Sequence, residues 1–251
     1  MQATTASAAL QEPPHSLLSE ASLFLDFDGT LVELADQPDG VAVDDALHAL
    51  LQRLADRLDG RVAIVSGRSV AQIDGFLGPA LGAIAVVGSH GAEIRRVGGA
   101  IVRPERPAAL ETAEAAFAER FASHAGVVIE VKTLGVAIHY RMAPDVEAEA
   151  KALVEAYARH EGLEVQHGKM MVELRMAGHD KGTAITQLAD EMPFQGHPPV
   201  FVGDDLTDEP GFVVCAHHGG AGILIGAPRD SAARFRFDGV ASFRRWLEAA
   251  A

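Results

Sequence analysis

The sequence predicts an α/β protein in which a Rossmann-like parallel-sheet core is interrupted by a smaller, inserted α+β unit. Continuous apolar runs alternate with helical periods at both ends of the chain, which is typical of a parallel sheet covered on both faces. In the middle, the order becomes helix, two strands, helix, two strands, which indicates a separate α+β layer. We therefore expect a core over 21–97 and 179–251, an insert over 98–178 and a frayed N-terminal tail over 1–20.

The first part of the core is expected to contain three buried strands and two helices. The apolar runs at 22–27, 61–65 and 83–88 are the strands. Asp44 is expected to cap a helix that ends near Gly60. Ser69 and Gln72 form a predicted capping box at the start of the next helix.

The insert and the second part of the core follow with their own patterns. In the insert we expect a short strand at 100–105, helices from Pro107 and around 146–157, and strand pairs at 127–132 with 135–141 and 163–168 with 169–175. After Gly178 the pattern of the core returns. We expect a helix from Lys181, strands at 198–203 and 222–226, and a C-terminal helix over 240–247.

The composition excludes several classes of protein. The 251 residues include 35 acidic side chains against 21 Lys and Arg, so the net charge of −14 disfavours a nucleic-acid or anionic-membrane partner. Cys215 is the single cysteine, which excludes an internal disulfide, and its apolar neighbours indicate a packed thiol. No signal-peptide pattern and no apolar run of about 20 residues is present. We expect a cytoplasmic monomer.

Polar residues follow the predicted core strands, at the edge where open parallel sheets bind ligands. Asp26 and Asp28 follow the first strand, Ser66 the second, and Asp204 and Asp205 a later one. Carboxylates that lie close together repel one another, and a hard cation such as Mg²⁺ removes this repulsion. Because Mg²⁺ is typically bound by one or two carboxylates together with substrate phosphate oxygens, such a site indicates phosphoryl chemistry. At positions i and i+2 of a strand, the first two acids would point the same way. One could attack phosphorus while the other protonates the leaving oxygen.

Four motifs together resemble the signatures of the haloacid-dehalogenase-like phosphatases: DFDGTL at Asp26, SGR at Ser66, HDKG around Lys181 and GDDLTDE at Gly203. The resemblance implies that Asp26 is the nucleophile and Asp28 the general acid/base. It implies that Ser66 and Lys181 hold the phosphoryl oxygens. It also implies an Mg²⁺ site made by Asp26, the backbone carbonyl of Asp28 and Asp204, supported by Asp205 and Asp208.

Further motifs resemble trehalose-6-phosphate phosphatases: GSHGAE at Gly88, EVK at Glu130, HYR at His139 and GKMMVELR at Gly168. The resemblance implies hydrolysis of a sugar phosphate under a mobile cap formed by the insert. It implies contacts to the glucose hydroxyls and the phosphate from Glu130, Lys132, Lys169 and Glu173. Further residues of the substrate cleft would be Gly67, Arg68, His90 and Arg141.

Several alternatives stay open at this point. Another capped sugar phosphatase, acting on sucrose phosphate or mannosyl-3-phosphoglycerate, has the same core motifs. A non-catalytic sugar-phosphate sensor on the same scaffold is a second alternative. Asp208 could be a helix cap that never approaches a metal. The charged residues of the insert could be an ordinary solvent-facing sheet surface.

Overall fold

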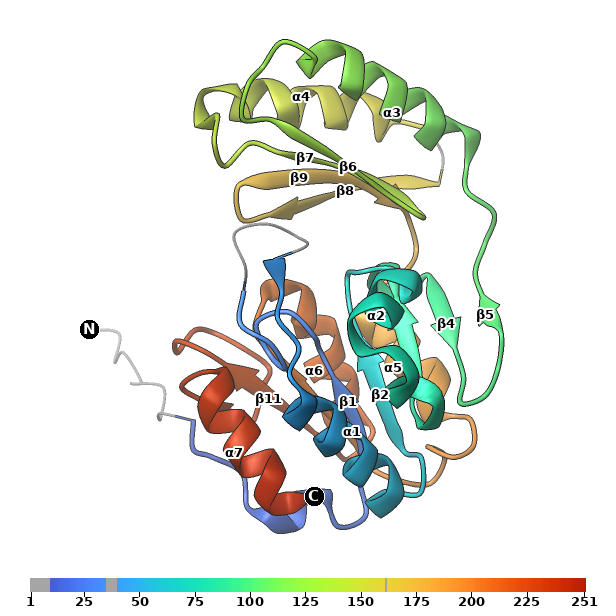
Figure 1. The fold of residues 1–251 in the computed structure, drawn as a ribbon, viewed down its shortest axis with the longest axis vertical. Coiled ribbons are helices and arrows are strands. Elements are labelled where there is room, and N and C mark those ends of the chain that lie inside the picture. The colour runs from blue at the N-terminus through green and yellow to red at the C-terminus, as the bar shows by residue number, and fades with distance from the viewer. Residues whose placement is uncertain (1–9, 35–39, 161) are drawn as a thin grey trace, which may run out of the picture. The chain divides into compact units, whose positions relative to one another are not determined.

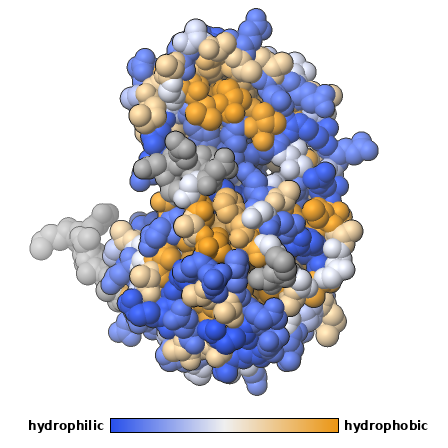
Figure 2. All heavy atoms as spheres, in the orientation of Figure 1, coloured by the Kyte–Doolittle hydropathy of each residue, from blue (hydrophilic) through white to orange (hydrophobic). Residues whose placement is uncertain are grey.

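The computed structural model describes residues 10–34, 40–160 and 162–251, so positions 1–9 of the expected tail, 35–39 of the expected core and 161 of the expected insert lie outside the described residues. The chain divides into two compact units (Figure 1). Unit 1 comprises Met1–Ile101 and Asp180–Ala251, and unit 2 comprises Val102–His179. Charged and polar side chains are spread over both units in Figure 2, while apolar side chains form small patches.

Unit 1 is built on a sheet with the strand order β12-β11-β10-β1-β2-β3-β4-β5. From β12 to β3 the neighbouring strands are parallel, and β4 is antiparallel to β3. The expected α/β fold with a mostly parallel sheet is therefore confirmed. The strands are β1 Ser22–Leu25, β2 Val62–Val65, β3 Ala85–Gly88, β4 Glu93–Arg95, β5 Ile101–Val102, β10 Pro199–Gly203, β11 Ala221–Ile225 and β12 Phe235–Phe237.

Helices cover both faces of this sheet because its central strands are apolar on both sides. Leu23 and Leu25 of β1 pack in one core cluster with α1, α2 and α7, whereas Phe24 packs in the other with α5 and α6. The helices are α1 Asp45–Arg57, α2 Val70–Leu77, α5 Lys181–Ala189, α6 Glu209–His217 and α7 Val240–Ala250, with the short 3-10 helices η1 His15–Leu18, η3 Gly78–Ala83, η4 Ser89–Gly91 and η6 Leu206–Asp208.

Local sequence signals place the helix starts. The Asp44 carboxylate accepts a hydrogen bond from the Leu47 backbone N–H at 2.8 Å, which satisfies one of the free N–H groups of α1. The capping box of Ser69 and Gln72 is present at the start of α2. Asp180 caps α5, so the residue that follows, Lys181, begins the helix. Two of these three caps were predicted, and their positions are confirmed.

Unit 2 is a four-stranded antiparallel sheet in the order β6-β7-β9-β8, with two helices on one face (Figure 1). Side chains from α3, α4 and alternate strand positions form its separate apolar core. The opposite face carries Glu130, Lys132, His139 and Glu173, and we call it the polar face. The elements are α3 Ala108–Phe121, β6 Val128–Lys132, β7 Gly135–His139, η5 Pro144–Val146, α4 Glu147–Tyr157, β8 Leu163–Gly168 and β9 Met171–Met176.

Two expectations are wrong, and two strands of unit 1 were not expected. Residues 10–20 are not frayed, because Leu18 is buried in the core and the Trp246 indole N–H donates to the Pro13 carbonyl at 3.0 Å. The short strand expected in the insert pairs instead at the edge of the unit 1 sheet, as β5. Strands β4 and β12 were not expected, since each has only three residues and too little apolar pattern to be recognised.

Candidate active site

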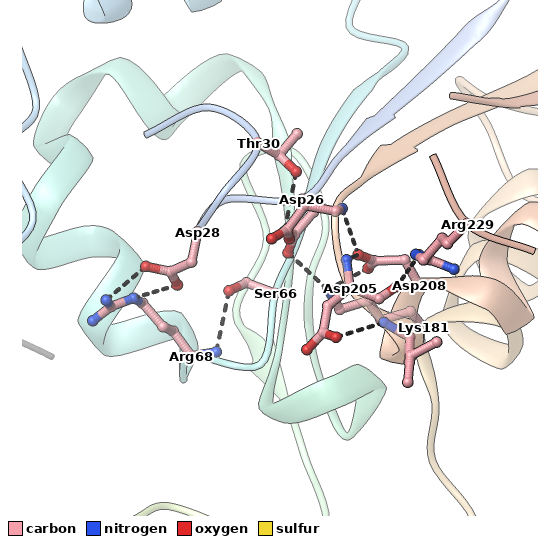
Figure 3. A network of polar contacts seen from close by, with 11 residues as sticks. Asp26, Asp28, Thr30, Ser66, Arg68, Lys181, Asp205, Asp208 and Arg229 are labelled. Atoms are coloured by element: carbon pink, nitrogen blue, oxygen red, sulfur yellow. Dashed lines mark hydrogen bonds and ion pairs between the residues drawn. The ribbon is translucent and has the colours of Figure 1, made fainter. Parts of the chain in front are cut away.

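The candidate active site lies where β1 ends, in the middle of the unit 1 sheet. Asp26 follows β1 directly, and its backbone N–H donates to the Val202 carbonyl of β10 at 2.9 Å. Its carboxylate accepts a hydrogen bond from the Lys181 ammonium at 2.7 Å. The same ammonium donates to the Asp208 carboxylate at 2.6 Å. All three side chains are buried, so three charged groups meet at the end of an apolar strand (Figure 3).

Asp26, Asp204 and Asp208 form a group that suits a divalent cation. Each offers one carboxylate oxygen, and these three oxygens lie within 4.8 Å of one another. Oxygen donors without sulfur or imidazole are those that Mg²⁺ prefers. Gly29 leaves the space for this group, since a Cβ there would lie 2.2 Å from the Asp204 carboxylate. The residues therefore fit Mg²⁺ in number, kind and room.

The carboxylates of this group are held close together against their mutual repulsion. Burial raises the pKa of Asp26 well above its usual value in spite of Lys181, and the charges of Asp208 and Asp204 raise it further. Burial, followed by the charge of Asp208, raises the pKa of Asp204 to about 7. A cation beside both carboxylates would remove this penalty, so the electrostatics also favour a metal site.

Lys181 keeps its charge in the interior because two acids flank it. Burial by itself would lower the pKa of Lys181, but the Asp208 and Asp26 carboxylates outweigh burial and raise it. The second Asp208 oxygen accepts hydrogen bonds from the backbone N–H groups of Asp204 and Asp205, both at 2.9 Å. Asp208 therefore does more than cap a helix, because it ties the acidic loop to the lysine.

Asp28 does not point toward Asp26, so the expectation that the two acids share one strand face is wrong. Strand β1 ends at Leu25, and both acids lie in the turn that follows. The Asp28 carboxylate instead pairs with the Arg68 guanidinium at 2.7 Å (Figure 3). The Ser66 hydroxyl accepts a hydrogen bond from the Arg68 backbone N–H at 3.1 Å.

The expected cleft residues Gly67 and His90 lie against each other in unit 1. A Cβ at Gly67 would lie 2.6 Å from the His90 imidazole, so only glycine allows this approach. His90 has a φ of 55°, and the preceding Ser89 has a φ of 50°, which is uncommon for two successive non-glycine residues. The His90 backbone N–H donates to the Ser66 carbonyl at 3.1 Å, which joins this turn to the loop after β2.

Asp205 is exposed and lies outside the group that suits a cation. Its carboxylate accepts a hydrogen bond from the Leu206 backbone N–H at 2.6 Å, so it caps η6. Its backbone carbonyl accepts a hydrogen bond from the Arg229 guanidinium at 2.8 Å (Figure 3). The structure thus gives the Asp205 side chain a place at the start of η6 rather than beside Asp26.

Three of the four sugar-contact residues expected in unit 2 lie together on its polar face. The Lys132 ammonium donates to the Glu173 carboxylate at 2.5 Å, and both side chains are largely buried. The fourth, Lys169, is exposed in the turn between β8 and β9, so the expectation that it shares a strand face with Glu173 is wrong. Arg141 is exposed just after β7.

Sequence reasoning missed three residues that contact these groups. The Thr30 hydroxyl donates to Asp26 at 3.3 Å, and the His139 imidazole lies 2.8 Å from the Glu130 carboxylate. The hairpin register pairs Glu130 with Ala137, which makes His139 a diagonal neighbour that the predicted strand pair could have revealed. Nothing in the sequence pointed to Arg229, which comes from a distant loop.

The fold and the arrangement of these charged groups identify the class of protein. An acidic site at the end of a central parallel strand, with a buried lysine on a neighbouring helix, lies on the fold of the haloacid-dehalogenase-like phosphatases. The C-terminal domain of a C. albicans trehalose-6-phosphate phosphatase has this fold, with a TM-score of 0.82, 22% identity and coverage of 98% of this chain and 99% of that one.

Sequence comparison then gives the family. The trehalose-phosphatase family matches residues 24–240. A probable trehalose-phosphate phosphatase of Sinorhizobium fredii is 41% identical over 231 residues, covering 90% of this chain and 86% of the relative. The trehalose-6-phosphate phosphatase of Escherichia coli is 37% identical over 241 residues, covering 95% and 89%. The chain belongs to the trehalose-phosphatase family. No helix in the described part of the chain is both long and apolar enough to cross a membrane.

Proposed function

We propose that this protein is a Mg²⁺-dependent phosphatase that hydrolyses trehalose 6-phosphate to trehalose and phosphate through an aspartyl phosphate on Asp26. The observation that carries the proposal is the buried Asp26 carboxylate, bonded to Lys181 and grouped with two further carboxylates, in a member of the trehalose-phosphatase family. The names of both curated relatives support this substrate.

Asp26 is the nucleophile of the first half-reaction. Lys181 and the Thr30 hydroxyl each hold one of its oxygens, which fixes the direction in which the carboxylate faces. A bond forms between an Asp26 oxygen and phosphorus while the bond between phosphorus and the sugar oxygen breaks. Asp28 donates a proton to that departing oxygen, so the sugar leaves as an alcohol. Ser66 and Lys181 hold the phosphoryl oxygens through this transfer.

Asp28 then acts in the opposite direction in the second half-reaction. It takes a proton from a water molecule whose oxygen attacks the phosphorus of the aspartyl phosphate. The Asp26–phosphorus bond breaks, phosphate leaves, and Asp26 returns as a carboxylate. Asp28 ends the cycle protonated, ready to donate to the next leaving oxygen. One acid thus supplies the proton of the first step and recovers it in the second.

Asp26, Asp204, Asp208 and the backbone carbonyl of Asp28 are the proposed Mg²⁺ ligands. The bound cation would supply charge that offsets the repulsion between the attacking carboxylate and the phosphate dianion. Asp205 supports the site through its place in the same loop. The raised pKa of Asp204, about 7, supports this proposal, because burial and the neighbouring Asp208 charge make its ionised form costly unless a cation compensates.

Side chains of the polar face are proposed to recognise the sugar. Glu130 and Glu173 are carboxylates that accept hydrogen bonds from vicinal hydroxyls, and Lys132 adds donors and positive charge. Lys169 and Arg141 are exposed near the ends of the strands of unit 2 and are proposed as further contacts. In unit 1, Gly67 and His90 are the proposed lining beside Ser66.

A panel of sugar phosphates, with phosphate release measured with and without Mg²⁺, tests the function. We expect trehalose 6-phosphate to be the preferred substrate and EDTA to abolish its turnover. Preference for sucrose phosphate or mannosyl-3-phosphoglycerate would replace the substrate while keeping the chemistry. Binding of trehalose 6-phosphate without any phosphate release would make the protein a sensor.

Asp26→Asn tests the covalent route. The amide is a poor nucleophile of nearly the same size, so turnover should fall by at least about a thousandfold, a loss within the range of known nucleophile removals. Thermal unfolding should show an intact fold. Asp56→Asn, on the exposed surface of α1, is the matched control and should keep full activity. Substantial turnover by Asp26→Asn would exclude an aspartyl phosphate on this residue.

A further inference from the structure

The Asp28 carboxylate is held by a two-point ion pair. The Arg68 Nε donates to one Asp28 oxygen and Nη2 to the other, each at 2.7 Å. Figure 3 shows the carboxylate directed toward this guanidinium and away from the Asp26–Lys181 pair. Two parallel N–H···O bonds fix direction as well as distance, so the pair sets the orientation of Asp28.

Arg68 is itself rigidly placed. Its backbone N–H donates to the Ser66 hydroxyl at 3.1 Å, and its carbonyl accepts from the Ser89 N–H at 2.8 Å. Its guanidinium carbon lies 4.8 Å from the centre of the Phe76 ring and 5.9 Å from that of Phe27. Only 12% of the Arg68 side chain is exposed. The two phenyl rings and the backbone hydrogen bonds therefore hold Arg68 in one position.

We propose that Arg68 is a positioning residue that acts on the reaction through Asp28 and not through the substrate. This inference rests on the proposed function, in which Asp28 must reach the leaving oxygen on the phosphorus attacked by Asp26. The ion pair with Arg68 is the position of Asp28 while its carboxylate is ionised, which in the proposed cycle is between the two proton transfers. From it the side chain turns toward the attacking water, and the protonated acid then faces the leaving oxygen of the next substrate.

This role of Arg68 differs from the substrate contact that the family resemblance implies. Loss of a substrate contact would affect mainly KM. A residue that places the acid/base acts mainly on kcat, because a misplaced proton donor slows the chemical step. It also acts most on leaving groups that need a proton. An alkoxide needs one, whereas nitrophenolate leaves without it.

Arg68→Met tests the inference, since methionine keeps an apolar stem against Phe76 and removes the ion pair. For trehalose 6-phosphate we expect kcat to fall about 10- to 100-fold, a part of what general acid–base catalysis contributes. KM should change less than about threefold. The kcat for p-nitrophenyl phosphate, measured as nitrophenolate released in the first turnover, should fall far less.

A double-mutant cycle with Asp28→Asn gives the decisive result. If Arg68 acts through Asp28, then Arg68→Met added to Asp28→Asn should lower single-turnover rates with trehalose 6-phosphate no further. Effects that multiply, or a large rise in KM, would overturn the inference and return Arg68 to the substrate. Wild-type protein that releases no phosphate from trehalose 6-phosphate would instead overturn the proposed function.

Arg95→Met is the matched control variant. Arg95 of β4 forms another Arg–Asp pair in unit 1, at 2.6 Å from Asp74 of α2, and its ion-pair partner among the described residues is not a proposed site residue. It should leave both substrates unaffected. Thermal unfolding checks the fold of every variant. If Arg68→Met does not fold, Arg68→Lys takes its place in the cycle, because lysine keeps the charge but cannot form both bonds at once.

Discussion

Asp26, Lys181 and Asp208 are buried side by side, and this arrangement is costly for stability. Each charge loses water, and the mutual ion pairs at 2.7 and 2.6 Å, with the hydrogen bonds from Thr30 and from the backbone of the acidic loop, compensate for this loss. Burial, followed by the charge of Asp208, raises the pKa of the remaining carboxylate of the group, Asp204, to about 7. Such an excess of buried acid is typical of a functional site and not of a core selected for stability.

Gly29 determines whether this group can form. It has a φ of 76°, and a Cβ would lie 2.2 Å from the Asp204 carboxylate. Gly29→Ala should therefore displace Asp204 and destabilise the protein by about 1–3 kcal/mol through backbone strain. The rise in Tm on adding Mg²⁺ should disappear, as measured by calorimetry.

Gly75→Ala is the control for this substitution. Gly75 lies in α2, and apart from its chain neighbours and the backbone of its own helix, no atom of the described residues lies within 4 Å of the position of its Cβ. Alanine should stabilise α2 by up to about 1 kcal/mol and leave the response to Mg²⁺ intact. An unchanged Mg²⁺ response in Gly29→Ala would show that Asp204 tolerates the added methyl group and that the close approach is unimportant.

The raised pKa of Asp204 makes stability depend on pH. An acid whose pKa is raised by folding binds its proton more tightly in the folded state. Stability in EDTA should therefore fall as pH rises from the unfolded pKa, about 4, to the folded pKa, about 7. Tm measured across this range should show the decline. Asp204→Asn, which cannot ionise, should make the decline shallower, and the decline that remains is expected from Asp26, whose pKa is raised as well.

Added Mg²⁺ provides the second arm of this experiment. A cation bound by the carboxylates keeps them ionised, so the decline between these pH values should be weaker in Mg²⁺ than in EDTA. Identical pH profiles in EDTA, in Mg²⁺ and in Asp204→Asn would contradict the assignment of the raised pKa to this carboxylate. The other acids of the chain titrate in all three samples, so their contribution to the pH dependence of Tm is the same in each and drops out of the difference.

At the scale of elements, the acidic loop between β10 and α6 depends on contacts from a distant loop. Arg229 donates to the Asp205 carbonyl at 2.8 Å and pairs with Glu209 at the start of α6. Glu209 in turn accepts a hydrogen bond from the Ala232 backbone N–H at 2.8 Å. The loop after β11 thus holds the backbone that carries Asp204 and Asp208.

Arg229→Gln should weaken metal binding without removing a ligand. Loss of an outer contact typically lowers metal affinity about 10- to 100-fold, and we expect a rise in the Mg²⁺ Kd of that order by titration calorimetry. Arg236→Gln is the control, because Arg236 donates to the Gly226 carbonyl at 2.6 Å and pairs with Asp238, and among the described residues these partners lie outside the acidic loop. A lower Tm with an unchanged Kd would make Arg229 a stabilising residue only.

At the scale of the whole molecule, the two units carry different parts of the proposed reaction, and each has its own apolar core. Unit 1 has its own apolar clusters on both faces of a sheet, and unit 2 has a third cluster between its sheet and its two helices. The charges that suit phosphoryl transfer lie in unit 1. The paired charges of the polar face lie in unit 2, on strands whose opposite sides are buried.

Glu130→Ala should therefore change substrate preference and not chemistry. Hydrogen bonds to charged groups contribute about 1.5–3 kcal/mol, so kcat/KM for trehalose 6-phosphate should fall about 10- to 100-fold. The kcat/KM for p-nitrophenyl phosphate should stay within about threefold, because this substrate has no sugar. Glu119→Ala, on the exposed side of α3, is the control and should change neither value. Equal losses on both substrates would remove Glu130 from sugar recognition.

The sequence alone determined the burial of the inner strands, the starts of two helices and the edge of the sheet at which the acidic residues lie. The inner strands are apolar on both sides and alternate with helices, so their burial and parallel pairing followed from the hydrophobic pattern. Helix starts at Asp44 and Ser69 followed from side-chain caps that act within three residues. Strand ends placed Asp26, Ser66 and Asp204 at one edge. These features depend on short-range bonding and on hydrophobic pattern, and both can be recognised in a single stretch of chain.

Only the tertiary structure decided which acid faces which base. Asp28 pairs with Arg68 and not with a neighbour of Asp26, Asp205 caps η6, and Arg229 supports the acidic loop from 24 positions away. The last strands at the sheet edge and the packing of residues 10–20 were equally hidden. Ion pairs and edge contacts join segments distant in sequence, and their partners depend on rotamers and loop paths that no local pattern encodes.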